Sequence, residues 1–299
     1  MDSTPLSGGN VVIINPISGP KRRGTATERV RQAKETFERL GVAGEIRLTE
    51  RQNHAYELAQ EAVRSGAALV VAWGGDGTIN EVARALVFSR TSLGIVPGGS
   101  GNGLSRDLKI PFHPPAALEH AVRSQDRILD AGELDGQLFF NIAGIGLDAH
   151  VAGMVATRIH HRGLIPYLAS TVGDLVRYKP RDYIVEADGE RFDITALMVV
   201  IANSTQYGFN TRIAPLAVAD DGLLDLVIIE HRGLSGNFRR VPSVFFGGLE
   251  KQPGVTMRKV GSVVVRSSSP MPLHVDGEPV REAIEVHARV HPGALRVRA

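Results

Sequence analysis

The chain has 299 residues, about twice the commonest domain size, so we expect one large domain or two ordinary ones. Its 34 basic and 32 acidic residues leave a formal net charge of +2, which gives no electrostatic reason to expect nucleic-acid binding. Without cysteine the chain cannot form disulfide bonds, thiolate metal sites or a cysteine nucleophile. No apolar stretch is long enough to span a membrane, and the first residues lack a signal-peptide pattern, so we expect a cytoplasmic protein.

The first 127 residues alternate between short apolar runs and helical patterns. The strand-like runs cover residues 11–15, 45–49, 68–73 and 92–97, and a helical pattern follows each of the first three. Strict alternation of this kind predicts a parallel sheet with helices on both faces, that is, a doubly wound α/β nucleotide domain. Ligands of such domains bind beyond the carboxyl ends of the strands.

From residue 128 onward the pattern changes to strand-like segments joined by turn signals such as Asp-Gly. Two helical stretches, residues 149–178 and 235–247, interrupt these strands. We therefore expect a second, C-terminal domain, a β-sandwich, over residues 128–289. The α/β domain is expected to cover residues 1–127, and the last residues, 290–299, are a candidate strand that returns to it.

Glycine clusters follow three strands of the predicted parallel sheet. Residues 15–20 read NPISGP, residues 74–78 read GGDGT and residues 97–103 read PGGSGNG. A single cluster of this kind is most simply a tight turn. Three of them at one edge favour a phosphate site, because glycine lets backbone N–H groups approach an anion and a following helix N-terminus adds its dipole.

These clusters match neither of the two commonest nucleotide-binding motifs. Residues 19–25 have the glycine spacing of a Walker motif, but Thr25 stands where that motif has lysine. No G-x-G-x-x-G follows the first strand, which argues against a Rossmann dinucleotide site. Residues 144–149, GIGLDA, fit that spacing but lie in the β-rich half, so we interpret them as a chance match. The ten histidines lack metal-ligand spacing and are expected at the surface.

The segments NPISG, GGDGTINEV, PGGSGNGLSRDL and VDGE resemble, in order and spacing, those of the diacylglycerol kinase catalytic family, which includes bacterial lipid kinases, sphingosine kinases and ceramide kinases. The likeness covers nearly the whole chain, through HRGLIPYLASTVGDLVRYKP, ADDGLLDL and QPGV. It implies an α/β nucleotide domain and a β-sandwich with the lipid site. The implied activity is transfer of the γ-phosphoryl group of ATP to a primary hydroxyl of a diacylglycerol- or sphingoid-like lipid, as part of phospholipid biosynthesis. Gly103 departs from many bacterial members, which have aspartate there, and is similar to the sphingosine and ceramide kinase branch.

By this resemblance, the first loop, the GGDGT turn and neighbouring side chains bind ATP. Lys21, Arg22 and Arg23 are candidates to neutralise phosphates, or they form an ordinary solvated face. Thr49 ends the second strand and Ser100 begins a helix, so both can reach a phosphate or ribose, or serve only as strand-end and capping hydroxyls. The expected ATP-binding residues are Asn15, Pro16, Ser18, Gly19, Thr49, Gly74, Gly75, Asp76, Gly77, Thr78, Asn80, Ser100 and Asn102.

The resemblance also assigns carboxylates to magnesium, which prefers oxygen ligands. Asp76, between glycines, is expected to organise Mg²⁺–ATP and to act in catalysis. Asp130 matches an acidic position of the metal–water network, or it forms a turn. Asp221 is expected to bind a second, structural Mg²⁺ together with the backbone carbonyls of Val218 and Leu223, or to belong to a hairpin turn.

The motif VDGE supplies the expected general base. A primary hydroxyl is a poor nucleophile, so a carboxylate within hydrogen-bond reach is needed to take its proton. The resemblance places this base at Asp276 or Glu278, and the sequence leaves open which of the two acts. The alternative is an Asp-Gly turn with exposed acids.

A lipid kinase of this kind must reach its substrate without crossing the membrane. Residues 151–181 and 231–240 combine apolar and basic side chains, which suits peripheral binding to an anionic bilayer, or an amphipathic helix packed on the sandwich. The competing functions are a catalytically inactive lipid- or nucleotide-binding regulator and another GGDGT kinase such as NAD kinase. The β-rich half and the late VDGE argue against NAD kinase, and the intact motifs argue against an inactive protein. The oligomeric state, a homodimer included, is left open.

Overall fold

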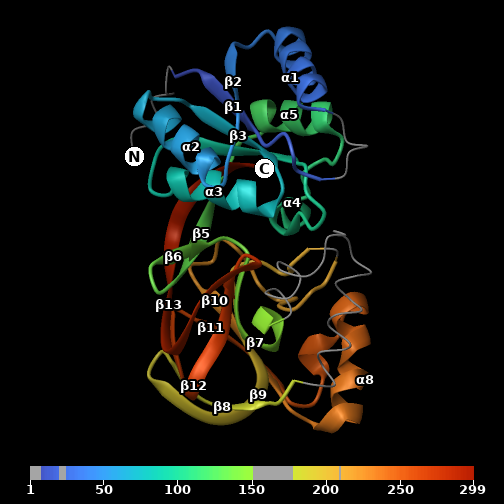
Figure 1. The fold of residues 1–299 in the computed structure, drawn as a ribbon, viewed down its shortest axis with the longest axis vertical. Helices are drawn as coiled ribbons and strands as arrows, with labels where there is room; N and C mark the ends of the chain where they lie inside the picture. The colour runs from blue at the N-terminus through green and yellow to red at the C-terminus, as the bar shows by residue number, and fades with distance from the viewer. Residues whose placement is uncertain (1–7, 20–24, 151–177, 209) are drawn as a thin grey trace. The chain divides into compact units, whose positions relative to one another are not determined.

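The computed structural model describes residues 8–19, 25–150, 178–208 and 210–299. The chain forms two compact units (Figure 1). Unit 1 consists of Met1–Leu129 and Gly293–Ala299, and unit 2 consists of Asp130–Pro292. The long last strand, β13 (Glu278–Arg298), therefore begins in unit 2 and ends in unit 1.

Unit 1 is built on a parallel sheet with the order β2-β1-β3-β4-β13. Its first four strands are β1 (Asn10–Ile14), β2 (Gly44–Leu48), β3 (Leu69–Gly74) and β4 (Ser92–Pro97). The central strands β3 and β4 are buried along their whole length, which requires cover on both faces of the sheet. The predicted doubly wound α/β domain is confirmed.

The helices of unit 1 pack in two pairs, α1 with α5 and α2 with α3 (Figure 1). α1 begins after Thr25, whose hydroxyl and the Glu28 side chain form a capping box, and it ends at Gly41, which adopts φ +67°. These local signals explain where the helix begins and ends. The helices are α1 (Ala26–Leu40), α2 (His54–Arg64), α3 (Asp76–Leu86), α4 (Gly103–Asp107) and α5 (Pro114–Arg123).

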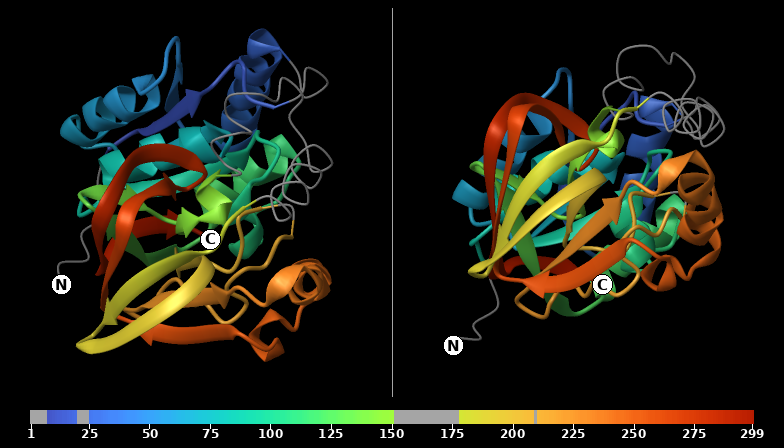
Figure 2. Two further views of the ribbon diagram at one scale, coloured as in Figure 1. Left: turned by 60° about the horizontal axis from the view of Figure 1, so that its bottom comes forward. Right: turned by 90° about the horizontal axis from the view of Figure 1, so that it is seen from below.

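Unit 2 is antiparallel and folds back on itself, as the predicted β-sandwich requires. Its sheet runs β11-β10-β9-β7-β12-β13, and β8 pairs with both β9 and β12. β7 and β8 thus lie one after the other between the same two strands (Figure 2). The strands are β5 (Asp126–Leu134), β6 (Gln137–Phe139), β7 (Ile142–Gly146), β8 (Arg181–Ala187), β9 (Glu190–Ala202), β10 (Leu224–Glu230), β11 (Val255–Val260) and β12 (Ser262–Val275), besides β13.

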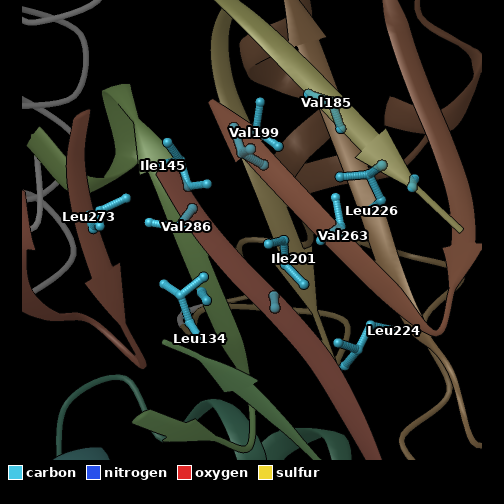
Figure 3. Packing of buried hydrophobic residues seen from close by; sticks show 14 of the residues in the cluster. Leu134, Ile145, Val185, Val199, Ile201, Leu224, Leu226, Val263, Leu273 and Val286 are labelled. Carbon is cyan, nitrogen blue, oxygen red and sulfur yellow. The ribbon is translucent and has the colours of Figure 1, made fainter. Parts of the chain in front are cut away.

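The interior of unit 2 is lined by aliphatic side chains from most of these strands (Figure 3). Ile145, Val199 and Leu226 come from three neighbouring strands and meet Val263 and Val286 from the far side of the fold. Alternate residues of each strand supply this core, as expected for strands with one buried face. The second predicted helix, residues 235–247, is α8 (Gly233–Phe246), and a short 3-10 helix, η2 (Leu249–Lys251), follows it. Most of the first, residues 149–178, lies outside the described residues.

A buried polar cluster of Asp148, Tyr207 and His274 lies within unit 2. His274 is 1% exposed, so our expectation that the histidines lie at the surface is wrong for this residue. Its Nε2 lies 3.1 Å from Asp148 Oδ2, and Tyr207 donates its hydroxyl to the same oxygen at 2.7 Å. His274 Nδ1 accepts the backbone N–H of Gly277 at 3.2 Å, which leaves the ring proton on Nε2. A Cβ at Gly144 would lie 1.8 Å from Asp148 Oδ2, so glycine is required beside the cluster.

We predict that His274→Ala destabilises unit 2. The substitution leaves the buried Asp148 with one partner fewer, and an unsatisfied buried group costs about 1–3 kcal/mol. Urea unfolding followed by circular dichroism measures the loss. The control is His287→Ala, because His287 is exposed and pairs with the surface residue Glu285. Equal unfolding midpoints for the two variants would show that the cluster contributes nothing to stability.

Candidate active site

The three glycine-rich loops of unit 1 touch one another beyond the ends of β1, β3 and β4. Asn15, in the first loop, donates its Nδ2 to Thr78 Oγ1 at 2.9 Å, which ties that loop to the start of α3. In the third loop, the Gly98 N–H donates to the carbonyl of Gly74 at 2.6 Å. A Cβ at Gly98 would lie 2.9 Å from Ser18 Oγ, so the first and third loops are also in contact. The convergence expected from the strand order is present.

The second and third loops approach each other backbone to backbone. A Cβ at Gly99 would lie 2.6 Å from the Cα of Gly75, a distance that real side chains do not tolerate. Asn102 closes the third loop on itself, because its Oδ1 accepts the Gly99 N–H at 3.0 Å and its Nδ2 donates to the Gly99 carbonyl at 2.9 Å. Asn102 is buried and adopts the left-handed φ of +53°. The glycines therefore allow the two loops to pack closely against each other.

Asp76 joins the second loop to the first turn of α4. Its Oδ2 accepts the backbone N–H of Asn102 at 2.9 Å, and its Oδ1 accepts that of Gly103 at 2.8 Å. Bonds between a carboxylate and backbone N–H groups at a helix start are among the stronger hydrogen bonds in proteins. Asp76 is thus an anchor of the loop arrangement, a role that the sequence analysis did not assign to it.

Arg29 holds the first loop, and it is not among the site residues predicted from the sequence. Its guanidinium is buried and donates to the Asn15 carbonyl at 2.7 Å, to Ser18 Oγ at 2.8 Å and to the Ser18 carbonyl at 2.7 Å. The sequence carries a signal for it, because Arg29 occupies the same face of α1 as the buried residues Ala33 and Phe37. A lone arginine on an apolar helix face indicates a buried partner.

The remaining expected ATP-binding residues lie on the same loops or at their edge. Thr49 follows β2, and its N–H donates to the carbonyl of Ile14 at 2.9 Å, so it lies beside the end of β1. Asn80 is half-buried in the first turns of α3, and Ser100 is half-buried in the third loop. The N-cap residue of α3 is Gly75, which has no side chain with which to cap the helix. Lys21, Arg22 and Arg23 lie outside the described residues.

In unit 2, Asp276 fixes the turn between β12 and β13. Its carboxylate accepts three backbone N–H groups, those of Phe140 at 3.0 Å, Asn141 at 2.9 Å and Ile142 at 3.0 Å. Asp276 and Gly277 have φ of +49° and +85°, as in a two-residue Asp-Gly hairpin turn, which here joins β12 to β13. The Gly277 N–H that follows is held by His274.

Glu278, two residues further on, is placed differently. Its side chain is exposed, and within the described part of the chain no hydrogen bond or ion pair engages its carboxylate. Asp276 is committed to the backbone, whereas Glu278 is available to a ligand. This contrast distinguishes the two acids of VDGE, which the sequence leaves equivalent.

Two of the acids expected to act at metal sites, Asp130 and Asp221, lie on and beside one loop of unit 2. Asp130 is buried and accepts the Gly222 N–H at 2.7 Å, and Asp221 accepts the Leu223 N–H at 3.1 Å. The ammonium of Lys259 hydrogen-bonds Asp221. Burial, the largest single effect, opposes the charged form of Lys259, but the hydrogen bonds and charges of Asp221 and Asp225 together outweigh it and raise the pKa of Lys259.

A positive charge therefore already balances Asp221, and the described residues contain no group of three or more His, Asp or Glu side chains that could hold a metal. The surroundings of Asp221, with the ammonium of Lys259 bonded to its carboxylate, are those of an ion pair. Mg²⁺ bound by Asp221 with the carbonyls of Val218 and Leu223 stays a prediction.

Comparison with known proteins was made against family models, curated relatives and solved structures. Residues 10–134 match the diacylglycerol kinase catalytic domain, and residues 141–299 match the YegS C-terminal NAD kinase beta sandwich-like domain. A probable lipid kinase YegS-like protein of Chromohalobacter salexigens is 31% identical over 88% of this chain and 87% of its own length. A diacylglycerol kinase of Bacillus subtilis is 29% identical over 89% of this chain and 88% of its own length.

Solved structures show the same fold. A putative diacylglycerol kinase from Bacillus anthracis has a TM-score of 0.80 at 22% identity, covering 97% of this chain and 96% of its own. An NAD kinase from Archaeoglobus fulgidus in complex with ATP has a TM-score of 0.54 at 14% identity, covering 97% of this chain and 93% of its own. Because both domain models and the curated relatives span the two units, the chain belongs to the family of diacylglycerol kinases and YegS-like lipid kinases, and it is a kinase.

Proposed function

We propose that the protein is an ATP-dependent lipid kinase that transfers the γ-phosphoryl group to a primary hydroxyl of a diacylglycerol- or sphingoid-like lipid. The observation that carries the proposal is the contact among the three glycine-rich loops at the carboxyl ends of β1, β3 and β4. Loops of this kind present backbone N–H groups to an anion, and α3 adds the positive end of its dipole. Phosphoryl transfer depends mainly on such positioning and on charge neutralisation.

ATP fits these loops on two counts. Gly75 and Gly99 place no Cβ on the loop backbone, and Gly75, the N-cap residue of α3, has no side chain to compete with a phosphate at the start of the helix. We assign phosphate and ribose binding to the loop residues expected above, with Arg29 as the group that holds the first loop. Here Arg29 is a positioning residue.

Asp76 is the candidate ligand of a nucleotide-bound cation. A carboxylate oxygen can accept two contacts, so its bonds to the Asn102 and Gly103 N–H groups do not prevent a further role. When bound, Mg²⁺ would neutralise phosphate charge during transfer. Asp76 would position the bound cation while its bonds to Asn102 and Gly103 connect the second loop to the start of α4.

Glu278 is the residue that we assign as general base. It would accept the proton of the lipid hydroxyl as the hydroxyl oxygen attacks the γ-phosphorus and ADP leaves. Its exposed carboxylate without a described partner supports the assignment, and the three N–H contacts of Asp276 argue against Asp276 in that role. Asp276 then fixes the turn that presents Glu278.

We place the enzyme in the cytoplasm with peripheral access to the bilayer. Among the described helices, none is both long and apolar enough to cross a membrane. Of the two stretches expected at the lipid surface, residues 151–177 lie outside the described residues, and α8 contains most of the other.

Product analysis tests the proposed function. The purified full chain is incubated with Mg²⁺ and ATP labelled at the γ-phosphate, together with diacylglycerol, monoacylglycerol, a sphingoid base, ceramide, phosphatidylglycerol or NAD in separate reactions. We expect label in one lipid or one class of lipid. Label only in NAD would make the protein an NAD kinase, and no label in any acceptor would favour a binding protein without catalysis.

We predict that Asp76→Asn lowers kcat/KM by at least about 100-fold, because one charge lost at a nucleotide-cation site removes several kcal/mol of transition-state stabilisation. The amide also faces the N–H of Asn102 or Gly103 with a donor instead of an acceptor. The control is Glu35→Gln, which removes an exposed acid from α1. Circular dichroism checks the fold of both variants. Normal turnover by a folded Asp76→Asn protein would remove Asp76 from the mechanism.

Separate substitutions in VDGE distinguish the base from the anchor. Glu278→Gln should lower kcat by about 10²- to 10⁴-fold, the usual contribution of a general base, without changing the calorimetric affinity for ATP. Asp276→Asn should lower the free energy of unfolding by about 1.5–3 kcal/mol or more, since hydrogen bonds to a charged group are lost. Full kcat in Glu278→Gln would place the base elsewhere. Unchanged stability in Asp276→Asn would remove the anchor role.

A further inference from the structure

Helix α8 exposes a stripe of apolar side chains. Leu234, Phe238, Pro242 and Phe246 are spaced four residues apart, so they lie along one side of the helix. Leu234 is 50% exposed and Phe246 is 90% exposed. Figure 2 shows α8 beside the strands of unit 2 rather than within their layers. An ordinary surface helix would present this stripe to the core.

The buried side of α8 is polar instead. Asn237, Arg240 and Ser243 are its buried residues. Asn237 Oδ1 accepts the Arg232 N–H at 3.1 Å, and Arg240 donates to the carbonyl of Glu230 at 2.6 Å. If α8 rotated to bury its apolar stripe, these hydrogen bonds would break and buried polar groups would be left unsatisfied. The bonds therefore hold α8 in its present orientation.

Two valines complete the attachment of α8. Val241 and Val244 are half-buried and pack on the apolar cluster that contains Val200, Val227 and Leu249. These valines and the polar contacts of Asn237 and Arg240 attach α8 to unit 2, and the apolar stripe remains exposed. Its inverted polarity calls for a partner other than unit 2 itself.

The charge around the stripe identifies the kind of partner. Residues 231–249 contain three arginines and no acidic residue. Arg239 is exposed, and no ion pair engages it within the described ranges. Arg232 lies at the N-terminal end of α8, where its Nη2 is 3.3 Å from Glu230 Oε2. Basic side chains beside exposed leucine and phenylalanine complement an anionic bilayer, where the apolar groups enter the boundary between headgroups and acyl chains.

We infer that α8 is the surface by which this kinase binds an anionic lipid bilayer, with Leu234, Phe238 and Phe246 inserted and Arg232 and Arg239 against lipid phosphates. The inference rests on the proposed function and names the surface that gives access to the substrate. A second copy of the chain is the less suitable occupant, because a symmetric contact through α8 would bring together two basic helices that contain no acidic residue of their own.

Vesicle binding tests the inference directly. The full chain is sedimented with vesicles of phosphatidylcholine alone or with about one third phosphatidylglycerol, at low and high salt. Wild type should bind the anionic vesicles, and Leu234→Ser/Phe246→Ser should bind them at least about 10-fold more weakly. Arg239→Gln should lose binding mainly at low salt.

The matched control is Leu216→Ser/Ile284→Ser. It removes two apolar side chains that are 56% and 59% exposed and lie outside α8. This control should bind as wild type does, and circular dichroism checks that all variants are folded. Equal vesicle binding by the α8 variant and wild type would overturn the inference. So would loss of a dimer in the α8 variant with vesicle binding retained, because the stripe would then belong to a second copy.

Activity on two substrate forms separates this inference from the proposed function. The α8 variant should keep its kcat on a short-chain lipid dissolved as monomers and lose activity on long-chain lipid in vesicles. If the wild type phosphorylates neither form, the proposed function fails, while the vesicle-binding result still decides the role of α8. Equal loss on dissolved and vesicle-bound lipid would contradict a role confined to membrane binding.

Discussion

The carboxylate of Asp76 is the interaction on which the nucleotide side of the structure depends. It accepts the N–H groups of Asn102 and Gly103 and so couples the turn after β3 to the loop after β4. Asn15 attaches the first loop to the start of α3 through Thr78, and Arg29 on α1 holds the first loop through Ser18. The three loops behave as one preformed surface, because each is hydrogen-bonded or packed against another. Preformed N–H groups need no reorganisation when charge develops on a phosphate.

In unit 2, the residues that hold the turn between β12 and β13 are different from the proposed base, Glu278. Asp276 is held by three backbone N–H groups and His274 holds Gly277, so the turn is rigid up to the residue before Glu278. The Asp148 carboxylate in turn orients His274. A buried polar network whose members hydrogen-bond one another favours a single geometry.

Much of unit 1 could be predicted from sequence because its signals are local. Buried apolar runs define β3 and β4, a capping box and Gly41 define α1, and glycine clusters at strand ends indicate the loops. Contacts between distant residues were not predictable in this way. Asp148 and His274 are 126 residues apart, and GIGLDA gave no local sign of a buried acid. The inverted polarity of α8 also depends on which of its faces unit 2 covers, which periodicity alone does not decide.

Amide hydrogen exchange of the full chain with and without Mg²⁺–ATP tests the central claim most directly. If the three loops form one nucleotide-binding surface, ATP should slow exchange in residues 15–19, 74–80 and 98–103 together. The shared response follows from the contacts of Asp76, Asn15 and Gly98 that link these segments. Protection confined to one loop, or no protection at saturating ATP, would contradict the claim.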